Sequence, residues 1–216
     1  MRLVALISGR GSNLEALLQA IDAGRIDGQM IAVISNRAEA AGLRYAATRG
    51  IPTTVLSHRD YASRAEYDGA LAACIERFEP DLVLLAGFMR ILGGDFVARF
   101  HGRMMNIHPS LLPAFPGLDT HQRALDAGVK IHGCSVHFVT ATVDHGPLIV
   151  QAAVPVRPDD DAATLAERVL AAEHRIYSRA VAWFCAGRLT LEGEKVHLRR
   201  TAADDDELAG TLLVSP

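Results

Sequence analysis

Residues 3–21 read LVALISGRGSNLEALLQAI, and this stretch determines how the chain begins to fold. The continuous apolar run from Leu3 to Ile7 is typical of a buried strand. It ends in the glycine-rich loop Ser8–Asn13, and apolar residues then recur at helical spacing up to a stop at Gly24. The sequence therefore predicts a strand, a glycine-rich loop and a helix, in that order.

The same alternation continues beyond this stretch. Apolar runs that predict strands occupy residues 30–34, 53–56 and 81–87. Helical patterns occupy residues 38–48 and the segment whose inward face carries Leu71, Ile75 and Phe78. Strands that alternate with helices are typical of a parallel sheet covered on both faces.

The pattern changes in the C-terminal half. Apolar and polar residues alternate from His132 to Val139, which predicts a half-exposed, antiparallel strand, and residues 148–156 predict another strand. A long helix is expected after Asp159–Asp161, and residues 189–198 predict a hairpin. We therefore expect an α/β fold with a Rossmann-like mixed sheet. Its strands should be mostly parallel, with antiparallel strands in the C-terminal half and helices on both faces.

Length and charge limit the possible classes of protein. A chain of 216 residues can bury a sizeable core without disulfides or metals. We expect a single domain over residues 1–200, with halves at about 1–100 and 101–200, and a flexible acidic tail at 201–216. The net charge of -3 and the sequence pI near 6.3 argue against binding to nucleic acid.

The three cysteines, Cys74, Cys134 and Cys185, predict neither a disulfide framework nor a zinc site, and they favour a reducing, cytoplasmic location. The apolar run at the amino terminus is too short for a spanning helix or a secretory signal, so no membrane role is expected. The nine histidines lack the spacing of metal ligands, and no metal site is expected.

The glycine-rich loop is the first candidate binding site. A turn from a strand into a helix exposes backbone N–H groups that attract phosphate. Gly11 would allow close approach, while Ser12 and Asn13 could add side-chain donors. A plain turn with Ser or Asn as helix cap is an equally good interpretation. Leu14 occupies the third glycine position of a dinucleotide fingerprint, so a simple phosphomonoester fits better than a nucleoside triphosphate or NAD.

The segment NIHPSLLP, from Asn106 to Pro113, is the second candidate. In an extended segment, Asn106 and His108 project to the same side. Asn106 would donate to a developing oxyanion, and His108 would supply or shuttle a proton. Taken alone, an Asn-x-His sequence is more often a surface histidine beside a proline-rich loop.

Two carboxylates could support this chemistry. Asp144 near His108 would favour the imidazolium form, although its sequence context is more commonly that of a turn residue. Glu173 lies at the edge of the apolar stripe of the long helix, so we expect it to be half buried. It could bind an ammonium or amide group of a substrate, but a pairing with Arg168 or Arg175 is the preferred local interpretation.

Four segments, in one order, carry a resemblance to a known family: Ser8–Leu14, Leu85–Leu92, Asn106–Pro113, and Gly133–Val139 with Asp144. Together they resemble the phosphoribosylglycinamide formyltransferases over residue 2 to about residue 190. The NIHPSLLP segment with the downstream aspartate is specific for folate-dependent formyl transfer. The SGxGSN loop points to the branch of the family that uses glycinamide ribonucleotide.

The resemblance implies an enzyme of de novo purine biosynthesis that uses no metal. It would move a formyl group from 10-formyltetrahydrofolate to the primary amine of glycinamide ribonucleotide, as a monomer or homodimer. The N-terminal half would bind phosphate, and the C-terminal half would bind folate and catalyse the reaction.

By position, the resemblance assigns catalysis to Asn106, His108 and Asp144. The substrate phosphate would be bound by Gly11, Ser12 and Asn13, and the glycinamide end by Glu173. The residues implied for folate binding are Arg64, Met89, Arg90, Ile91, Leu92, Asn106, Thr140, Ala141, Thr142, Val143 and Asp144.

The chain departs from the family pattern in two places. His145 stands where many relatives would have glycine, and the tail after about residue 200 has no recognised counterpart. Formyltetrahydrofolate hydrolase is the nearest rival, but it usually carries an additional N-terminal regulatory domain, whereas the first strand expected here starts at Arg2. A methionyl-tRNA formyltransferase would need a further C-terminal domain and a basic surface. A non-catalytic phosphate- or folate-binding module is the alternative from a different class.

Overall fold

The computed structural model describes residues 1–201 and the short strand at 213–214, and it divides into two compact units. The first unit comprises residues 1–106 and 139–141, and the second unit comprises residues 107–138 and 142–216. The expected acidic tail at 201–216 falls almost entirely outside the described residues. The assignment of residues 1–200 to a single domain stays a prediction.

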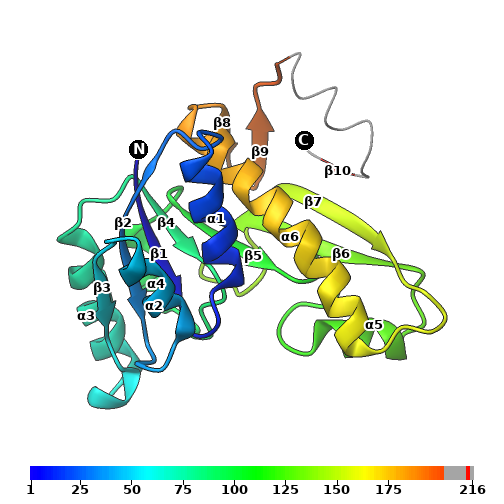
Figure 1. Ribbon diagram of the computed structural model, residues 1–216, viewed down its shortest axis with the longest axis horizontal. Helices are drawn as coiled ribbons and strands as arrows, with labels where there is room; N and C mark the ends of the chain where they lie inside the picture. The colour runs from blue at the N-terminus through cyan, green and yellow to red at the C-terminus, as the bar shows by residue number, and fades with distance from the viewer. Residues whose placement is uncertain (202–212, 215–216) are drawn as a thin grey trace. The chain divides into compact units, whose positions relative to one another are not determined.

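Parallel strands form the sheet of the first unit. They are β1 (Arg2–Ile7), β2 (Gln29–Ser35), β3 (Thr53–Val55), β4 (Leu82–Leu85) and β5 (Met104–His108), whose last two residues belong to the second unit. The strands pair in the order β5-β4-β1-β2-β3, and every pairing is parallel (Figure 1). The continuous apolar runs of the sequence correspond to these strands because both faces of the sheet are covered.

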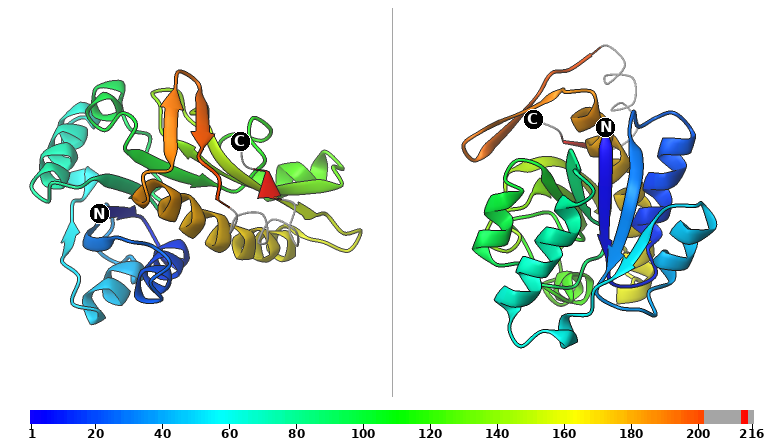
Figure 2. Two further views of the ribbon diagram at one scale, coloured as in Figure 1. Left: turned by 90° about the horizontal axis from the view of Figure 1, so that it is seen from above. Right: turned by 90° about the vertical axis from the view of Figure 1, so that its left-hand side faces the viewer.

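The helices of the first unit are α1 (Ser12–Asp22), α2 (Ala41–Thr48), the 3-10 helix η1 (His58–Asp60), α3 (Arg64–Glu76) and α4 (Gly94–Arg99). Helices α3 and α4 pack on one face, where Leu6, Leu71 and Phe96 share a buried core. Helices α1 and α2 lie on the opposite face (Figure 2, right). The first unit is therefore a three-layer α/β arrangement, as the sequence predicts.

The second unit contains antiparallel strands and a long helix. Its elements are α5 (Thr120–Asp126), β6 (Ile131–Phe138), β7 (Leu148–Pro155), α6 (Ala162–Cys185), β8 (Leu189–Glu192), β9 (Lys195–Leu198) and β10 (Leu213–Val214). Strands β6 and β7 pair antiparallel, as do β8 and β9. The expected mixture of parallel and antiparallel strands is confirmed.

Strand β6 is buried on both faces, which corrects the expectation of a half-exposed strand. Every residue from His132 to Phe138 is buried. Helix α6 covers one face, and Phe138 meets Phe184 of that helix edge to face. The other face carries Ser135, whose hydroxyl donates to the carbonyl of Ser110 at 2.7 Å. A loop that lies 23 residues earlier in the sequence therefore buries the polar face.

Helix α6 begins and ends where the sequence predicts. Asp161 is its N-cap and forms a capping box with Thr164, which satisfies backbone groups that a helix end leaves open. Gly187 follows its end with φ of +62°, a left-handed conformation that glycine adopts without strain. The predicted stripe is buried along its whole length: Leu165, Val169, Ala172, Ile176, Ala180 and Trp183.

Several element boundaries differ from the expectations. Helix α2 begins at Ala41 and not at residue 38, because a turn with a hydrogen bond from Ala40 N–H to the Arg37 carbonyl precedes it. Phe78 lies beyond the end of α3 and packs on the core from the following turn. The short helices η1, α4 and α5 were not predicted, because three to seven residues carry too little periodicity.

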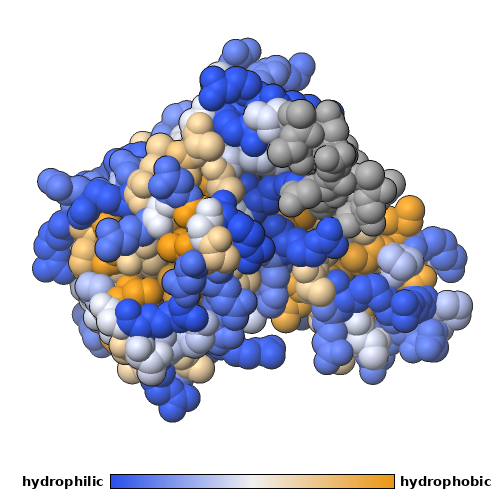
Figure 3. Space-filling model, turned by 45° about the horizontal axis from the view of Figure 1, so that its top comes forward, coloured by the Kyte–Doolittle hydropathy of each residue, from blue (hydrophilic) through white to orange (hydrophobic). Residues whose placement is uncertain are grey.

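Polar side chains cover most of the face drawn in Figure 3, with apolar areas between them, as on an ordinary protein surface. Within the described part of the chain, no helix is both long enough and apolar enough to cross a membrane.

Candidate active site

His108 is the last residue of β5, and its ring is held at both nitrogens. Nδ1 lies 3.4 Å from Oδ1 of Asp144, and Nε2 lies 3.1 Å from the carbonyl oxygen of Phe115. Only 6% of His108 is exposed. A carboxylate and a carbonyl both accept hydrogen bonds, so the ring is surrounded by acceptors and fixed in orientation. Asp144 and His108, which the resemblance assigns to one catalytic set, lie side by side in this geometry.

Asp144 is fixed in turn by its own backbone and by a neighbouring loop. Its Oδ2 accepts a hydrogen bond from the N–H of Gly117 at 2.8 Å. Asp144, Phe115 and Asp119 all have φ between +52° and +56°, a region that residues other than glycine rarely adopt. Such conformations persist only where the surroundings impose them, and they concentrate at functional sites.

Asp144 also borders a cavity of about 620 Å³ in the second unit. The loop that contains His145 forms one wall, and the β8–β9 hairpin forms another. Asp144 therefore lies between this cavity and the buried ring of His108.

Asn106 precedes His108 by two residues on the same strand and is partly buried. Side chains two residues apart on a strand project to the same side, as expected for this pair. An amide donor and an imidazole on one side of a strand can both act on one carbonyl group.

A further histidine adjoins the pair and was missed in the sequence. Nε2 of His137 lies 4.0 Å from Oδ1 of Asp144, and its Nδ1 lies 2.9 Å from the carbonyl oxygen of Phe138. Burial lowers the pKa of His137, and His108 lowers it further against the opposing effects of Phe138 and Asp144. The alternation along β6 predicts an exposed face for His137, so no sequence signal pointed to this residue.

The glycine-rich loop has the geometry of an open helix start in the first unit. Gly11 is the N-cap of α1, with φ of +84° and no side-chain capping hydrogen bond. The interpretation of Ser12 or Asn13 as a simple helix cap is therefore wrong. A Cβ atom on Gly11 would lie 2.8 Å from Cα of Gly42, so glycine is required for close packing as well as for conformation. The first turn of α1 presents its N–H groups next to this loop.

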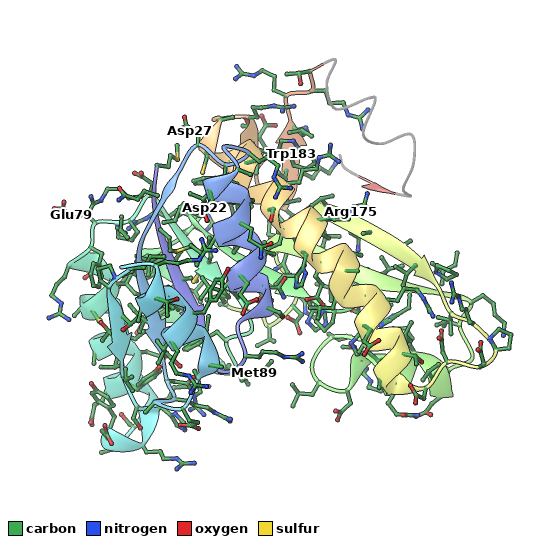
Figure 4. All side chains as sticks on the ribbon, in the orientation of Figure 1. Asp22, Asp27, Glu79, Met89, Arg175 and Trp183 are labelled. Atoms are coloured by element: carbon green, nitrogen blue, oxygen red, sulfur yellow. The ribbon has the colours of Figure 1, made fainter. Side chains whose placement is uncertain are left out.

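The residues expected to bind folate occur in both units. Arg64 is the exposed first residue of α3, and the loop after β4 exposes 63% of Met89 (labelled in Figure 4) and 58% of Ile91. Leu92 is buried in the core and could offer a ligand only its backbone. Within the described part of the chain, Nε of Arg90 is buried without a hydrogen bond, which suits an incoming acceptor.

The other expected folate residues lie on either side of the point after residue 141, where the chain passes from the first unit to the second for the last time. Thr140 and Ala141 belong to the first unit, and Thr142, Val143 and Asp144 belong to the second. Ala141, Thr142 and Val143 are exposed, and Thr140 is partly buried. Exposed side chains at this turn are available to a ligand.

Glu173 lies on α6 and is only 7% exposed, so the expectation of a half-buried side chain is wrong. Arg168, one of its two expected partners, instead forms two hydrogen bonds to Asp160, at 2.6 and 2.7 Å. Burial raises the pKa of the Cys134 thiol, and the charge of Glu173 raises it further, so the carboxylate acts on the interior of the second unit. A buried carboxylate is a rare feature that suits recognition of a polar ligand.

Among the residues that the structure describes, no group of three or more His, Cys, Asp or Glu side chains is placed to hold a metal ion.

Comparisons with known proteins place this geometry in a family context. Residues 1–181 match the family model described as formyl transferase. The chain is 46% identical to phosphoribosylglycinamide formyltransferase of Escherichia coli over 212 residues, covering 95% of this chain and all of that protein. It is 49% identical to the human trifunctional purine biosynthetic protein adenosine-3 over 190 residues, which is 88% of this chain but only 19% of the human protein.

A solved structure agrees with these sequence matches. Glycinamide ribonucleotide transformylase 1 from Symbiobacterium toebii superimposes with a TM-score of 0.90 and 49% identity, covering 92% of this chain and 93% of that one. The similarity extends over the elements that carry the candidate site.

Proposed function

Because this chain belongs to the formyl transferase family, we propose that it transfers the formyl group of 10-formyltetrahydrofolate to the primary amine of glycinamide ribonucleotide. The products are formylglycinamide ribonucleotide and tetrahydrofolate, in the formyl-transfer step of de novo purine biosynthesis. The observation that best supports this reaction is the ring of His108, held between Asp144 and the Phe115 carbonyl on the strand that carries Asn106. The match to the whole length of the Escherichia coli enzyme supports glycinamide ribonucleotide as the acceptor of the formyl group.

The reaction is a direct attack of the amine nitrogen on the formyl carbon. A C–N bond to the substrate forms, and the carbonyl oxygen becomes a tetrahedral oxyanion. Asn106 stabilises that oxyanion by donating a hydrogen bond, and His108 in its protonated form stabilises it by its positive charge. The bond from the formyl carbon to the folate nitrogen then breaks. The attacking nitrogen loses one proton, and the folate nitrogen gains one, with His108 or water as the carrier.

The remaining residues bind and orient the two substrates. Gly11, Ser12 and Asn13 bind the phosphate of the ribonucleotide at the start of α1. Glu173 binds its glycinamide end. The loop from Met89 to Leu92 and the turn from Thr140 to Asp144 hold the folate, together with Arg64 and Asn106. Holding both substrates in attack geometry supplies a large part of the rate enhancement.

We assign the activity to residues 1–200 as one domain, acting without a metal as a monomer or homodimer. A cytoplasmic location is supported by Cys74, Cys134 and Cys185, which are buried and form no disulfide in the described part of the chain.

The test follows tetrahydrofolate release from 10-formyltetrahydrofolate, with and without glycinamide ribonucleotide. The native protein should release tetrahydrofolate only when the ribonucleotide is present, with formylglycinamide ribonucleotide formed in equal amount. The His108→Ala variant should lose about 100-fold or more of this rate, as expected for the loss of a general acid–base group.

His101→Ala is the matched control, because His101 is exposed and lies three residues before β5 begins. It should retain the native rate. Release of tetrahydrofolate without the ribonucleotide would identify a formyltetrahydrofolate hydrolase. No release under either condition would leave a binding protein and refute the proposed transfer.

A further inference from the structure

The loop at residues 86–93 joins β4 to α4 and lies entirely in the first unit. Phe88 and Leu92 are buried in the core that α3 and α4 cover. Between them, Met89 and Ile91 are among the most exposed large apolar side chains of the described residues. The loop is therefore anchored in the core on both sides of Met89 and Ile91, whose side chains are open to a ligand.

Two side chains from distant segments hold the backbone of this loop. The N–H of Met89 donates to Oγ of Ser8 at 2.8 Å, and the N–H of Gly93 donates to Oδ2 of Asp68 at 2.8 Å. Ser8 follows β1, Asp68 lies on α3, and both residues are buried. These bonds bracket the exposed stretch, because one fixes its start and the other fixes its end.

The hydroxyl of Ser8 is itself oriented. It donates to Oδ1 of Asn36 at 2.6 Å, which leaves its lone pairs free to accept from Met89. The backbone N–H of Ser8 also donates to the carbonyl of Gly87 at 3.1 Å. Nδ2 of Asn36 lies 3.3 Å from Nδ1 of His58, so the amide is held as well. Buried networks of this kind rigidify the groups they connect.

Rigidity matters at this loop because its exposed side chains are apolar. A loop that must be ordered when a ligand binds loses affinity through conformational entropy, and a loop that is already ordered does not. Supporting hydrogen bonds from outside the contact surface are the usual means of fixing such a loop.

We propose that Ser8, oriented by Asn36, and Asp68 are positioning residues for the formyl donor. They hold residues 86–93 in the conformation that presents Met89, Arg90 and Ile91 to the folate. This inference rests on the proposed function, since it takes the loop to be a folate-binding surface.

The first experiment measures KM for both substrates and kcat in Ser8→Ala and Asp68→Ala. KM for 10-formyltetrahydrofolate should rise about fivefold to tenfold, the change expected from the loss of one hydrogen bond. KM for glycinamide ribonucleotide and kcat should each stay within about twofold. Asp68→Asn keeps an oxygen that can accept from Gly93, so it should restore a KM near that of the native protein.

Ser35→Ala is the matched control. Ser35 is a buried serine at the end of the adjacent strand β2, and its hydroxyl bonds the backbone of Arg37 and not the folate loop. The Ser35→Ala variant should lose about as much stability as Ser8→Ala but leave the KM values for both substrates unchanged. An unchanged KM for the folate in Ser8→Ala and Asp68→Ala would overturn the proposal. So would an equal rise in both KM values.

Amide hydrogen exchange of the ligand-free protein separates this inference from the proposed function. Exchange in peptides that cover residues 86–93 should accelerate in Ser8→Ala and Asp68→Ala but not in Ser35→Ala. Calorimetric titration of the native protein with tetrahydrofolate tests the loop without turnover. Binding of tetrahydrofolate without formyl transfer would reject the proposed function and keep the positioning roles. Native exchange rates in both variants would reject the positioning roles whatever the activity.

Discussion

The rings of His121 and His132 meet edge to face in the second unit, with centroids 5.3 Å apart. Burial lowers the pKa of His132 to about 4, with smaller contributions from His121 and His108. Burial also lowers the pKa of His121. Both rings are therefore neutral in the folded protein near pH 7, close to the loop that holds His108.

The His121–His132 pair predicts that the protein loses stability in mild acid. At about pH 7.5 and above, both rings are largely neutral in the folded and the unfolded chain. As the pH falls from 6.5 towards 4, the unfolded chain binds protons that the folded His132 does not bind, so the free energy of unfolding decreases. The expected loss from His132 is on the order of 3 kcal/mol. Urea unfolding between pH 7.5 and 4.5 measures it.

The variant His132→Asn should flatten that pH dependence, because it removes the titrating ring and retains a donor for the Pro109 carbonyl. His101→Asn, at an exposed histidine, should keep the native slope. The same slope in all three proteins would show that the buried pair does not cause the acid sensitivity.

Removing the charge of Asp144 should reduce kcat strongly. Asparagine tolerates the left-handed φ of +56° at this position and keeps an oxygen for the Gly117 N–H, so Asp144→Asn isolates the charge. The imidazolium of His108 would lose its counter-charge, and kcat should fall about 100-fold or more. Steady-state kinetics with Asp126→Asn as control, at an exposed carboxylate on α5, would test this. A decrease of less than about threefold would remove Asp144 from the catalytic set.

Gly11 should tolerate no side chain. In Gly11→Ala the new Cβ would lie 2.8 Å from Cα of Gly42, at a φ of +84°, so α1 and α2 must separate. We expect a loss of about 1–3 kcal/mol in stability and a raised KM for the ribonucleotide. In Gly24→Ala the φ is similar, at +70°, but no atom lies within 4 Å of the new Cβ. If urea unfolding showed the same loss of stability in Gly11→Ala and Gly24→Ala, the close contact with Gly42 would not contribute to the cost of the substitution.

The capping box of α6 predicts a measurable effect on stability alone. Asp161→Ala removes the acceptor for the Thr164 N–H and should decrease the free energy of unfolding by about 1 kcal/mol. Asp159→Ala, at an exposed carboxylate two residues earlier, should have little effect. Chemical denaturation of both variants measures this difference in stability. A loss of activity without a loss of stability in Asp161→Ala would contradict the prediction that the cap affects stability alone.

Local signals in the sequence predicted much of this fold. The run before Ser8, the acidic cap at Asp161 and the stop at Gly187 each depend on neighbouring residues, and the structure contains all three. The placement of Asn106 and His108 on one side of β5 was also predictable locally, because side chains two residues apart on a strand project to the same side.

Contacts between distant segments account for what the sequence did not reveal. The second buried face of β6 depends on the Ser110–Ser135 bond, and the burial of His137 follows from the same packing. The Phe115 carbonyl reaches His108 through a backbone conformation that a phenylalanine does not signal. Glu173 was expected to be half buried at the edge of the apolar stripe, because a helical wheel does not show which segments pack against the helix.

The position of Ser8 has a consequence for exchanging parts between related proteins. Ser8 directly follows β1, begins the glycine-rich loop and holds the N–H of Met89 through its hydroxyl. Consider a chimaera that takes residues 86–93 from one parent and residues 1–13 from another. Its Met89 N–H would come from one parent, and the Ser8 hydroxyl that accepts its hydrogen bond would come from the other. Hybrids should therefore work best when the two segments are inherited together, with Asn36 from the same parent.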